Sequence, residues 1–180
     1  MIQEILSIFY FLLPAGFANM APVMCKNLLK SWAVPIDANK TWNGKPIFGK
    51  HKTWRGLLLG SLFGVIIFFI QQKLYIFPFF QSYSLVNYSE TSIFLGFLLG
   101  FGAVFGDLIK SFLKRRVNIA SGKSWIPFDQ IDYTIGAIAC AAPIYFVGWL
   151  ESIYGVLIYF ILHVIINHIA YYTKIRGEKW

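Results

Sequence analysis

GDLIKSFLKRRVNIASGKSWIPFDQID, residues 106–132, is a charged stretch that lies between two long apolar runs. It contains five Lys or Arg residues and three of the chain's eight acidic residues, Asp107, Asp129 and Asp132. The whole chain is 57% hydrophobic and only 13% charged, whereas an ordinary soluble domain has roughly 25% charged residues. This contrast predicts a membrane protein in which residues 106–132 connect two spanning helices at one membrane face.

Five apolar runs are long enough, or nearly so, for the roughly 20 residues that a spanning helix needs. They begin near Gln3, Leu57, Ser92, Tyr133 and Ser152. We therefore expect an all-α integral membrane protein with five transmembrane helices and two ordered basic cytoplasmic loops, forming a single domain over residues 1–180.

The second apolar run is the weakest of the five. Only fourteen residues separate its start from the polar positions Gln71, Gln72 and Lys73. Fourteen helical residues rise about 21 Å, which is short for a membrane. The helix is therefore expected to continue past the glutamines.

The distribution of positive charge predicts the orientation of the chain, because cytoplasmic loops collect Lys and Arg. Of the sixteen Lys and Arg residues, seven lie in residues 26–55, five in residues 110–123 and three in residues 174–180. The opposite face would have Lys73 and the acids Glu4, Glu90 and Glu151. We expect a multi-pass protein of the cell membrane with its amino terminus outside and its carboxyl terminus and both basic loops in the cytoplasm.

Helical spacing places four polar residues of the charged stretch on one face. Asp107, Ser111, Lys114 and Arg115 are spaced i, i+4, i+7 and i+8, so they share a face if the third apolar run continues as a helix into the cytoplasm. An ionised carboxylate near the hydrocarbon edge is costly and by default faces a partner or a water-filled site. We expect a functional role for Asp107; the alternative is a simple ion pair with Lys110 or Lys114.

A second group of acids, Asp129 and Asp132, is spaced i, i+3 after Pro127, where the fourth apolar run starts. The two side chains would share a face at a helix amino terminus, where their alternative role is to complement the helix dipole. Together with Asp107 they offer oxygen ligands only, which favours a hard cation. Magnesium suits them, because it is held by one or two carboxylates plus substrate phosphates.

The first basic loop, NKTWNGKPIFGKHKTWRG over residues 39–56, mixes cations with glycines and tryptophans. This mixture suits a loop that anchors phosphates while its backbone amides stay accessible. The GxxxxGK[ST] spacing of a P-loop is absent. The alternative is an interfacial loop in which Trp42 and Trp54 belong to an aromatic belt. The candidate phosphate ligands are Lys40, Lys45, Lys50, Lys52 and Arg55.

These observations predict a phosphate-handling site at the inner membrane face, with acids for magnesium and cations for several phosphates. Asn19, near the inner end of the first apolar run, either lines this cavity or makes an interhelical hydrogen bond. A substrate with a lipid tail would explain why the site lies among spanning helices. Phosphoryl or nucleotidyl transfer onto a lipid fits, because positioning and charge neutralisation do most of the work in such reactions.

The same motifs resemble those of a known enzyme family. GDLIKSFLKRR, the pair Gly122 and Lys123, and FDQID resemble the signature of the CDP-lipid synthases, the membrane cytidylyltransferases. FGKHKTWRG and NMAPV resemble the archaeal-type branch, the CDP-archaeol synthases. The bacterial and eukaryotic CDP-diacylglycerol synthases have a Lys-Asp pair and a His-Gly-Gly segment before their final acidic motif. Here SWIPFDQID follows Lys123 instead, which favours the archaeal-type branch.

The resemblance implies a magnesium-dependent reaction of CTP with 2,3-bis-O-(geranylgeranyl)-sn-glycerol 1-phosphate, which gives a CDP-activated lipid and pyrophosphate. It implies metal ligands at Asp107, Asp129 and Asp132, which with Lys114 are also the catalytic residues. It implies a nucleotide site formed by Ser111, Lys114, Arg115, Lys52, Thr53 and Arg55. We expect the lipid phosphate to be bound by Asn19, Lys40 and Trp54.

The expected partners are CTP, the lipid phosphate and membrane lipids, with no nucleic acid, and a homodimer is left open. One alternative function is a phosphatidate cytidylyltransferase that makes CDP-diacylglycerol. A second, of a different class, is a small transporter or lipid-binding membrane protein, which the interruption at residues 71–73 keeps open. The CDP-alcohol phosphatidyltransferases depend on a DG-x2-AR-type motif, and the sequence has no such pattern.

Overall fold

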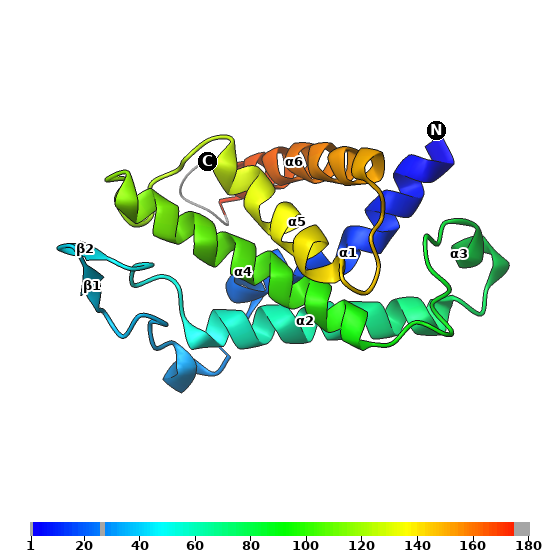
Figure 1. Cartoon of the computed structure of the whole chain (residues 1–180), viewed down its shortest axis with the longest axis horizontal. Coiled ribbons are helices and arrows are strands. Elements are labelled where there is room, and N and C mark those ends of the chain that lie inside the picture. The colour runs from blue at the N-terminus through cyan, green and yellow to red at the C-terminus, as the bar shows by residue number, and fades with distance from the viewer. Residues whose placement is uncertain (1, 26–27, 175–180) are drawn as a thin grey trace.

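The computed structural model describes residues 2–25 and 28–174, and this part of the chain is mainly helical (Figure 1). Within these residues, four helices are long and apolar enough to cross a membrane: α1 (Ile2–Met24), α2 (Trp54–Leu74), α4 (Phe94–Arg116) and α6 (Trp149–Tyr172). The shorter elements are the 3-10 helix η1 (Lys30–Trp32), strands β1 (Thr41–Trp42) and β2 (Lys45–Pro46), and helices α3 (Pro78–Ser82) and α5 (Phe128–Ala141). The prediction of a mainly helical multi-pass membrane protein is confirmed.

The fourth predicted span is shorter than expected. Helix α5 has 14 residues, which rise about 21 Å, whereas the hydrocarbon core is about 30 Å thick. The structure therefore supports four spans by length and leaves the count of five as a prediction. Helix α2 does continue past Gln71 and Gln72, as expected, and ends at Leu74.

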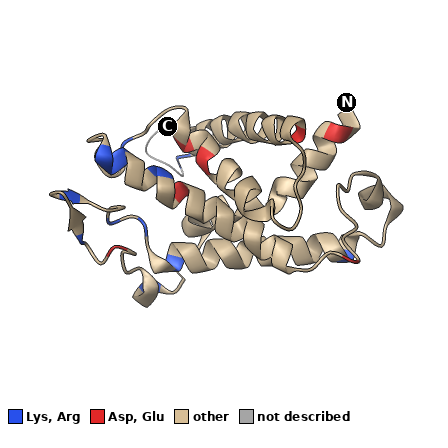
Figure 2. Ribbon diagram, viewed as in Figure 1, with Lys and Arg blue, Asp and Glu red and all other residues tan. Residues whose placement is uncertain are grey.

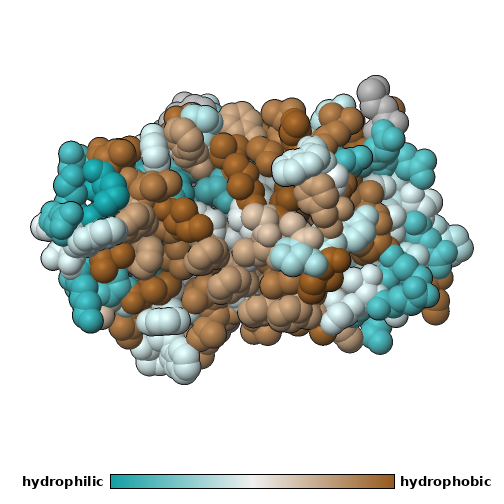
Figure 3. Space-filling view, in the orientation of Figure 1, coloured by the Kyte–Doolittle hydropathy of each residue, from teal (hydrophilic) through white to brown (hydrophobic). Residues whose placement is uncertain are grey.

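Apolar side chains cover the middle of one face of the molecule (Figure 3). In Figure 3 hydrophobic side chains cover the centre of the visible face, and hydrophilic side chains gather toward its two ends. Figure 2 shows Lys and Arg gathered at the end where the β1–β2 hairpin and the carboxyl end of α4 lie. Lys26, Arg176 and Lys179, which belong to the predicted charge bias, lie outside the described residues.

Glycines bring α2 and α4 into backbone contact. A Cβ built on Gly64 of α2 would lie 2.5 Å from the Cα of Gly100, and a Cβ on Gly96 would lie 2.3 Å from the Cβ of Phe68. Helices that approach this closely need small residues at the crossing. Gly96 and Gly100 form a GxxxG pair, the spacing that lets two helices approach this closely.

A second glycine contact joins α4 to α5. A Cβ on Gly106 would lie 2.2 Å from the backbone oxygen of Asp132, and a Cβ on Gly136 would lie 2.2 Å from the backbone oxygen of Gly102. Because Gly106 precedes Asp107 in the chain, this contact places the acidic residues of the two helices next to one another.

Candidate active site

The three predicted acidic residues converge on one ammonium group. The Nζ of Lys110 lies 3.0 Å from Asp107 Oδ1, 2.6 Å from Asp129 Oδ1 and 3.0 Å from Asp132 Oδ2. The Lys110 side chain is only 12% exposed. The ion pair between Asp107 and Lys110 that was the alternative reading of Asp107 is thus present, as one part of a larger cluster.

Two further lysines complete this acid–lysine cluster. The Nζ of Lys52, from the first basic loop, donates to Asp107 Oδ2 at 2.5 Å. The Nζ of Lys114 donates to both carboxylate oxygens of Asp129 at 3.0 Å and to the backbone oxygen of Lys123. Three carboxylates therefore face three ammonium groups, drawn from the first loop, α4 and α5.

Local structure explains how these side chains meet. Helix α4 extends without a break to Arg116, so Asp107, Lys110 and Lys114 lie on one face of it, as the spacing predicts. Asp129 lies in the first turn of α5, and its Oδ2 accepts a hydrogen bond from the backbone N–H of Trp125 at 2.5 Å. The predicted position of the second acid group at a helix amino terminus is confirmed.

The donor set of the cluster fits a hard divalent cation. Asp132 Oδ2 is buried and accepts no hydrogen bond, although it lies within ion-pair distance of Lys110. Carboxylate oxygens are the ligands that magnesium prefers. Within residues 2–25 and 28–174, however, no three Asp, Glu, His or Cys side chains are placed so that they could hold a metal ion as they stand. The Lys110 ammonium lies between the three carboxylates instead.

Asp37 organises the first basic loop from its interior. Its Oδ2 accepts hydrogen bonds from the backbone N–H groups of Phe48 and Gly49, both at 2.9 Å, and its Oδ1 accepts one from Asn39 at 3.0 Å. Burial opposes ionisation of this carboxyl, but the backbone donors outweigh it and hold the pKa of Asp37 below its ordinary value. The loop that carries Lys52 is thus folded around a buried carboxylate.

The order of this loop is expected to depend on pH. Because the pKa of Asp37 is lower in the folded than in the unfolded chain, its stabilisation is complete above the unfolded value of about 3.9 and is lost as the pH falls through the folded value. Hydrogen exchange at Phe48 and Gly49, corrected for the intrinsic pH effect, should report this loss. Asp37→Asn should lose about 1.5–3 kcal/mol of local protection at neutral pH. Unchanged protection in Asp37→Asn would contradict this role.

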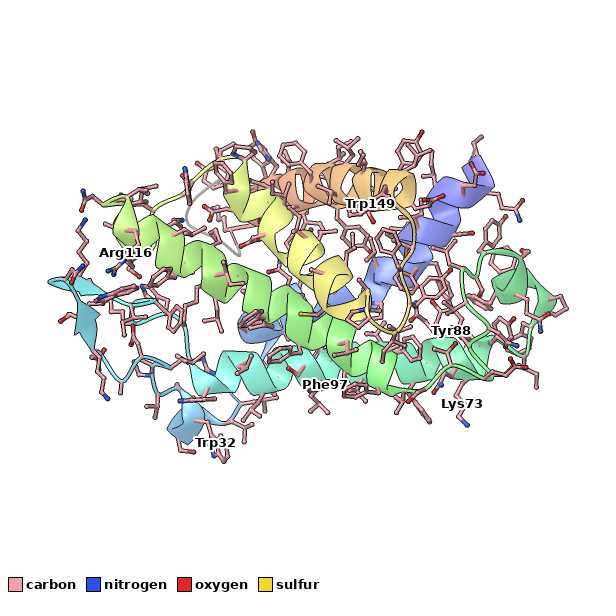
Figure 4. All side chains as sticks on the ribbon, viewed as in Figure 1. Trp32, Lys73, Tyr88, Phe97, Arg116 and Trp149 are labelled. Atoms are coloured by element: carbon pink, nitrogen blue, oxygen red, sulfur yellow. The ribbon has the colours of Figure 1, made fainter. Side chains whose placement is uncertain are left out.

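Arg116 fastens the β1–β2 hairpin to the end of α4. Its guanidinium donates to the backbone oxygens of Trp42 at 2.7 Å, Lys45 at 3.2 Å and Pro46 at 2.6 Å, and it lies 5.5 Å from the centre of the Trp42 ring. Figure 4 shows Arg116 beside the hairpin. The Nζ of Lys45 donates back to the Arg116 backbone oxygen at 3.1 Å.

Arg116→Lys should loosen this hairpin while it preserves the charge. An ammonium cannot reproduce the planar fork that bonds three carbonyls at once. We expect a loss of about 1.5 kcal/mol in local stability, measured as faster hydrogen exchange and proteolysis within residues 40–48. Lys50→Met, which removes an exposed cation of the same loop, should leave both rates unchanged. Equal effects of the two substitutions would contradict the role of the Arg116 guanidinium in holding the hairpin.

The remaining predicted ligands lie around the cluster in different settings. Ser111 and Arg115 are buried, and Arg115 Nε donates to the Ser111 backbone oxygen at 3.5 Å. Thr53 caps α2, where its Oγ1 accepts from Gly56 N–H at 3.2 Å. Arg55 Nη1 lies 3.5 Å from the Leu28 backbone oxygen.

The three predicted lipid-phosphate ligands lie in different environments. Asn19 is half-buried in α1, and Lys40 is exposed. Trp54 is exposed and lines a shallow cleft with Ser31, Trp32 and Val34. Within the described residues, no hydrogen bond or ion pair joins these side chains to the acid–lysine cluster.

The roles of Asp37 and Arg116, and two of the three acidic contacts of Lys110, were not predicted from the sequence. Helical spacing predicts the ion pair of Lys110 with Asp107, but not its contacts with Asp129 and Asp132. Asp37 could have been noticed as the lone acid between Lys26 and Arg55. Arg116 was assigned to the general bias of basic residues toward the inner face, and no local pattern separates it from its neighbours.

The fold and the cluster define a polytopic helical membrane protein with a charged, phosphate-compatible site at one end. A solved structure described as an intramembrane enzyme for archaeal membrane lipids biosynthesis has the same fold. Its TM-score is 0.71 at 24% identity, and the match covers 88% of this chain and 90% of that one.

The family model "CarS-like: CDP-archaeol synthase" matches residues 1–180. CDP-archaeol synthases of Pyrococcus furiosus and Thermococcus kodakarensis are 38% and 36% identical to the chain; the alignments cover 99% of both chains in the first case, and 96% of this chain and 94% of the relative in the second. The enzyme of Methanocaldococcus jannaschii is 32% identical, over 95% of this chain and 94% of its own length. The chain belongs to the CDP-archaeol synthase family.

Membership in this family confirms the prediction of a CTP-dependent lipid cytidylyltransferase of membrane lipid biosynthesis. It also decides against a transporter or a simple lipid-binding protein. Metal-dependent catalysis is the general expectation for cytidylyltransferases, and CTP and a lipid phosphate are the general substrate classes.

Proposed function

We propose that this chain transfers CMP from CTP to 2,3-bis-O-(geranylgeranyl)-sn-glycerol 1-phosphate with the help of Mg²⁺, and that the acid–lysine cluster is the active site. The observation that carries the assignment is the convergence of Asp107, Asp129 and Asp132 on one point, next to three lysine ammonium groups. A reaction between two phosphate-bearing substrates needs both signs of charge in one place. The cluster supplies them toward the end of the molecule where Lys and Arg gather (Figure 2).

The proposed reaction is a single displacement at phosphorus. An oxygen of the lipid phosphate attacks the α-phosphorus of CTP and forms the new P–O bond of the CDP-lipid. The bond between the α-phosphorus and the oxygen that bridges to the β-phosphorus breaks, and pyrophosphate leaves with that electron pair. Magnesium, when bound, neutralises charge on the triphosphate. No residue needs to form a covalent intermediate.

The candidate site residues have the following roles in the proposed reaction. Asp107, Asp129 and Asp132 hold the metal, and Lys114 neutralises charge on the triphosphate during the displacement. The nucleotide site is completed by Lys52, Thr53, Arg55, Ser111 and Arg115. Lys52 is the best supported of these, because it already contacts Asp107. Asn19, Lys40 and Trp54 are proposed to bind the lipid phosphate.

The proposed topology has five spans in one domain over residues 1–180, with the amino terminus outside and both basic loops inside. Support comes from the gathering of Lys and Arg at one end of the molecule (Figure 2). Helix α5 and residues 142–148 carry the chain from the loop that follows α4 to the start of α6. We propose that this segment, although its helix has only 14 residues, is the fifth crossing.

Pyrophosphate release by the purified protein tests the proposed reaction. The protein would be supplied with CTP, Mg²⁺ and either the geranylgeranyl ether-lipid phosphate or diacyl phosphatidic acid. We expect CTP-dependent release with the ether lipid, matched by an equal amount of CDP-lipid, and little with the diacyl lipid. A preference for phosphatidic acid would replace the substrate with that of the diacyl alternative, and no release with either lipid would overturn the proposal.

A further inference from the structure

Lys110 is the residue with the largest number of acidic contacts in the described part of the chain. Its Nζ is within 3.0 Å of oxygens from Asp107, Asp129 and Asp132, which lie on two different helices. The Lys110 ammonium therefore occupies the position that a metal ion bound by these three carboxylates would take. Lys52 and Lys114 differ from it, because each contacts only one of the three acids.

The Lys110 ammonium is needed to neutralise the partly buried carboxylates around it. Its side chain is 12% exposed, and the Asp132 side chain is 7% exposed. Three partly buried carboxylates with no cation between them would repel one another strongly, because burial weakens screening by water. The ammonium therefore holds the two helices' acids together when no metal is present.

We propose, on the basis of the proposed function, that Lys110 is a positioning residue that occupies the metal position in the nucleotide-free enzyme and is displaced when the metal arrives with the triphosphate. With three ammonium groups facing three carboxylates, the cluster has little net charge to attract a bare divalent ion. A metal that arrives on the triphosphate brings excess negative charge with it. The lysine ammonium groups then gain phosphate oxygens as they give up carboxylate oxygens.

This arrangement makes metal binding depend on the nucleotide. A bare metal ion must displace the Lys110 ammonium without supplying it with a new partner. The bare ion can bind only to the small fraction of molecules in which the ammonium has moved away, so the apparent affinity for the ion is reduced by that fraction. When a triphosphate is present, its oxygens can bind the displaced Lys110 ammonium. The metal affinity is then no longer reduced by the small fraction of molecules in which the ammonium has moved away. The enzyme would thus not retain a metal ion that lacks its nucleotide.

The test measures Mn²⁺ binding to the purified full-length protein without nucleotide, from the electron paramagnetic resonance signal of free Mn²⁺. Lys110→Met removes the charge and keeps the approximate shape, so we expect Mn²⁺ to bind at least about tenfold more tightly than to the wild type. Lys73→Met loses the same charge at the other end of the molecule (Figure 4) and should bind like the wild type. Equal or weaker Mn²⁺ binding by Lys110→Met would overturn the proposal.

A second measurement on the wild type keeps the proposal testable if Lys110→Met does not fold. Mn²⁺ alone should hardly change the thermal unfolding temperature, whereas Mn²⁺ with α,β-methylene-CTP should raise it clearly above the value with the analogue alone. If Mn²⁺ alone raises it as much as the combination, Lys110 does not exclude the bare ion. Neither arm needs turnover, so a wild type that binds Mn²⁺ as expected but releases no pyrophosphate would refute the proposed function and leave the role of Lys110 standing.

Discussion

Asp132→Asn is expected to lower the turnover number by about 10²–10³-fold, which is the range for removal of one well-placed electrostatic contact in a transition state. The substitution keeps the shape of the side chain but replaces an anionic oxygen by a neutral amide. The affected oxygen is buried, accepts no hydrogen bond and faces Lys110 at 3.0 Å. An amide at that point can neither hold a divalent cation well nor balance the ammonium.

The activity of Asp132→Asn would be measured as CDP-lipid formed per enzyme with saturating CTP, Mg²⁺ and ether-lipid phosphate. Glu90→Gln is the matched control, because it makes the same chemical change at an exposed carboxylate in the loop before α4. The control should keep full activity. Turnover by Asp132→Asn within a few-fold of the wild type would remove Asp132 from the site.

Gly106→Ala is expected to reduce both stability and activity. The new methyl group would lie 2.2 Å from the Asp132 backbone oxygen, so α4 and α5 must separate. Overpacking of this kind costs about 1–3 kcal/mol, even though alanine favours the helix over glycine by roughly 0.5–1 kcal/mol. Because Asp107 and Asp132 lie on either side of the contact, their separation should also lower turnover, and a misplacement of about 1 Å can cost about 10²-fold.

The control for Gly106→Ala is Gly56→Ala near the start of α2. The nearest atom to a Cβ at Gly56 is Thr53 Oγ1 at 3.6 Å, an ordinary van der Waals contact. Thermal unfolding in detergent should show a lower midpoint for Gly106→Ala and little change for Gly56→Ala. If the two substitutions have the same effect, the close approach of α4 and α5 does not position the acids.

The sequence was sufficient to predict the helices and the acids that meet. Apolar runs predict the four long helices, and the i, i+4, i+7 pattern predicts the polar face of α4, because both depend on helical periodicity within one segment. The start of α5 was also predictable, from Pro127 and the acids that follow it. Its early end at Ala141 was missed because the apolar character of the chain continues through residues 142–147, although Pro143 is a helix-stop signal.

The central contacts of the site were harder to predict because they join distant parts of the chain. Lys52 reaches Asp107 across 55 positions, and Arg116 reaches the hairpin across more than 70. The bias of positive charge toward one membrane face explains why these basic residues lie there, but it does not predict which group each of them contacts. Lys110 shows the limit most clearly: its spacing predicts one ion pair, and only the packing of α5 on α4 adds the other two.

The most direct test of the account is Mg²⁺-dependent equilibrium binding of CTP to the wild type and to Asp107→Asn, without any lipid. If one cluster binds metal and nucleotide together, CTP should bind saturably to the wild type only when Mg²⁺ is present. Asp107→Asn that still unfolds cooperatively should bind CTP at least about tenfold more weakly. CTP binding of equal strength in both proteins, or binding indifferent to Mg²⁺, would contradict the assignment of the acid–lysine cluster as the active site.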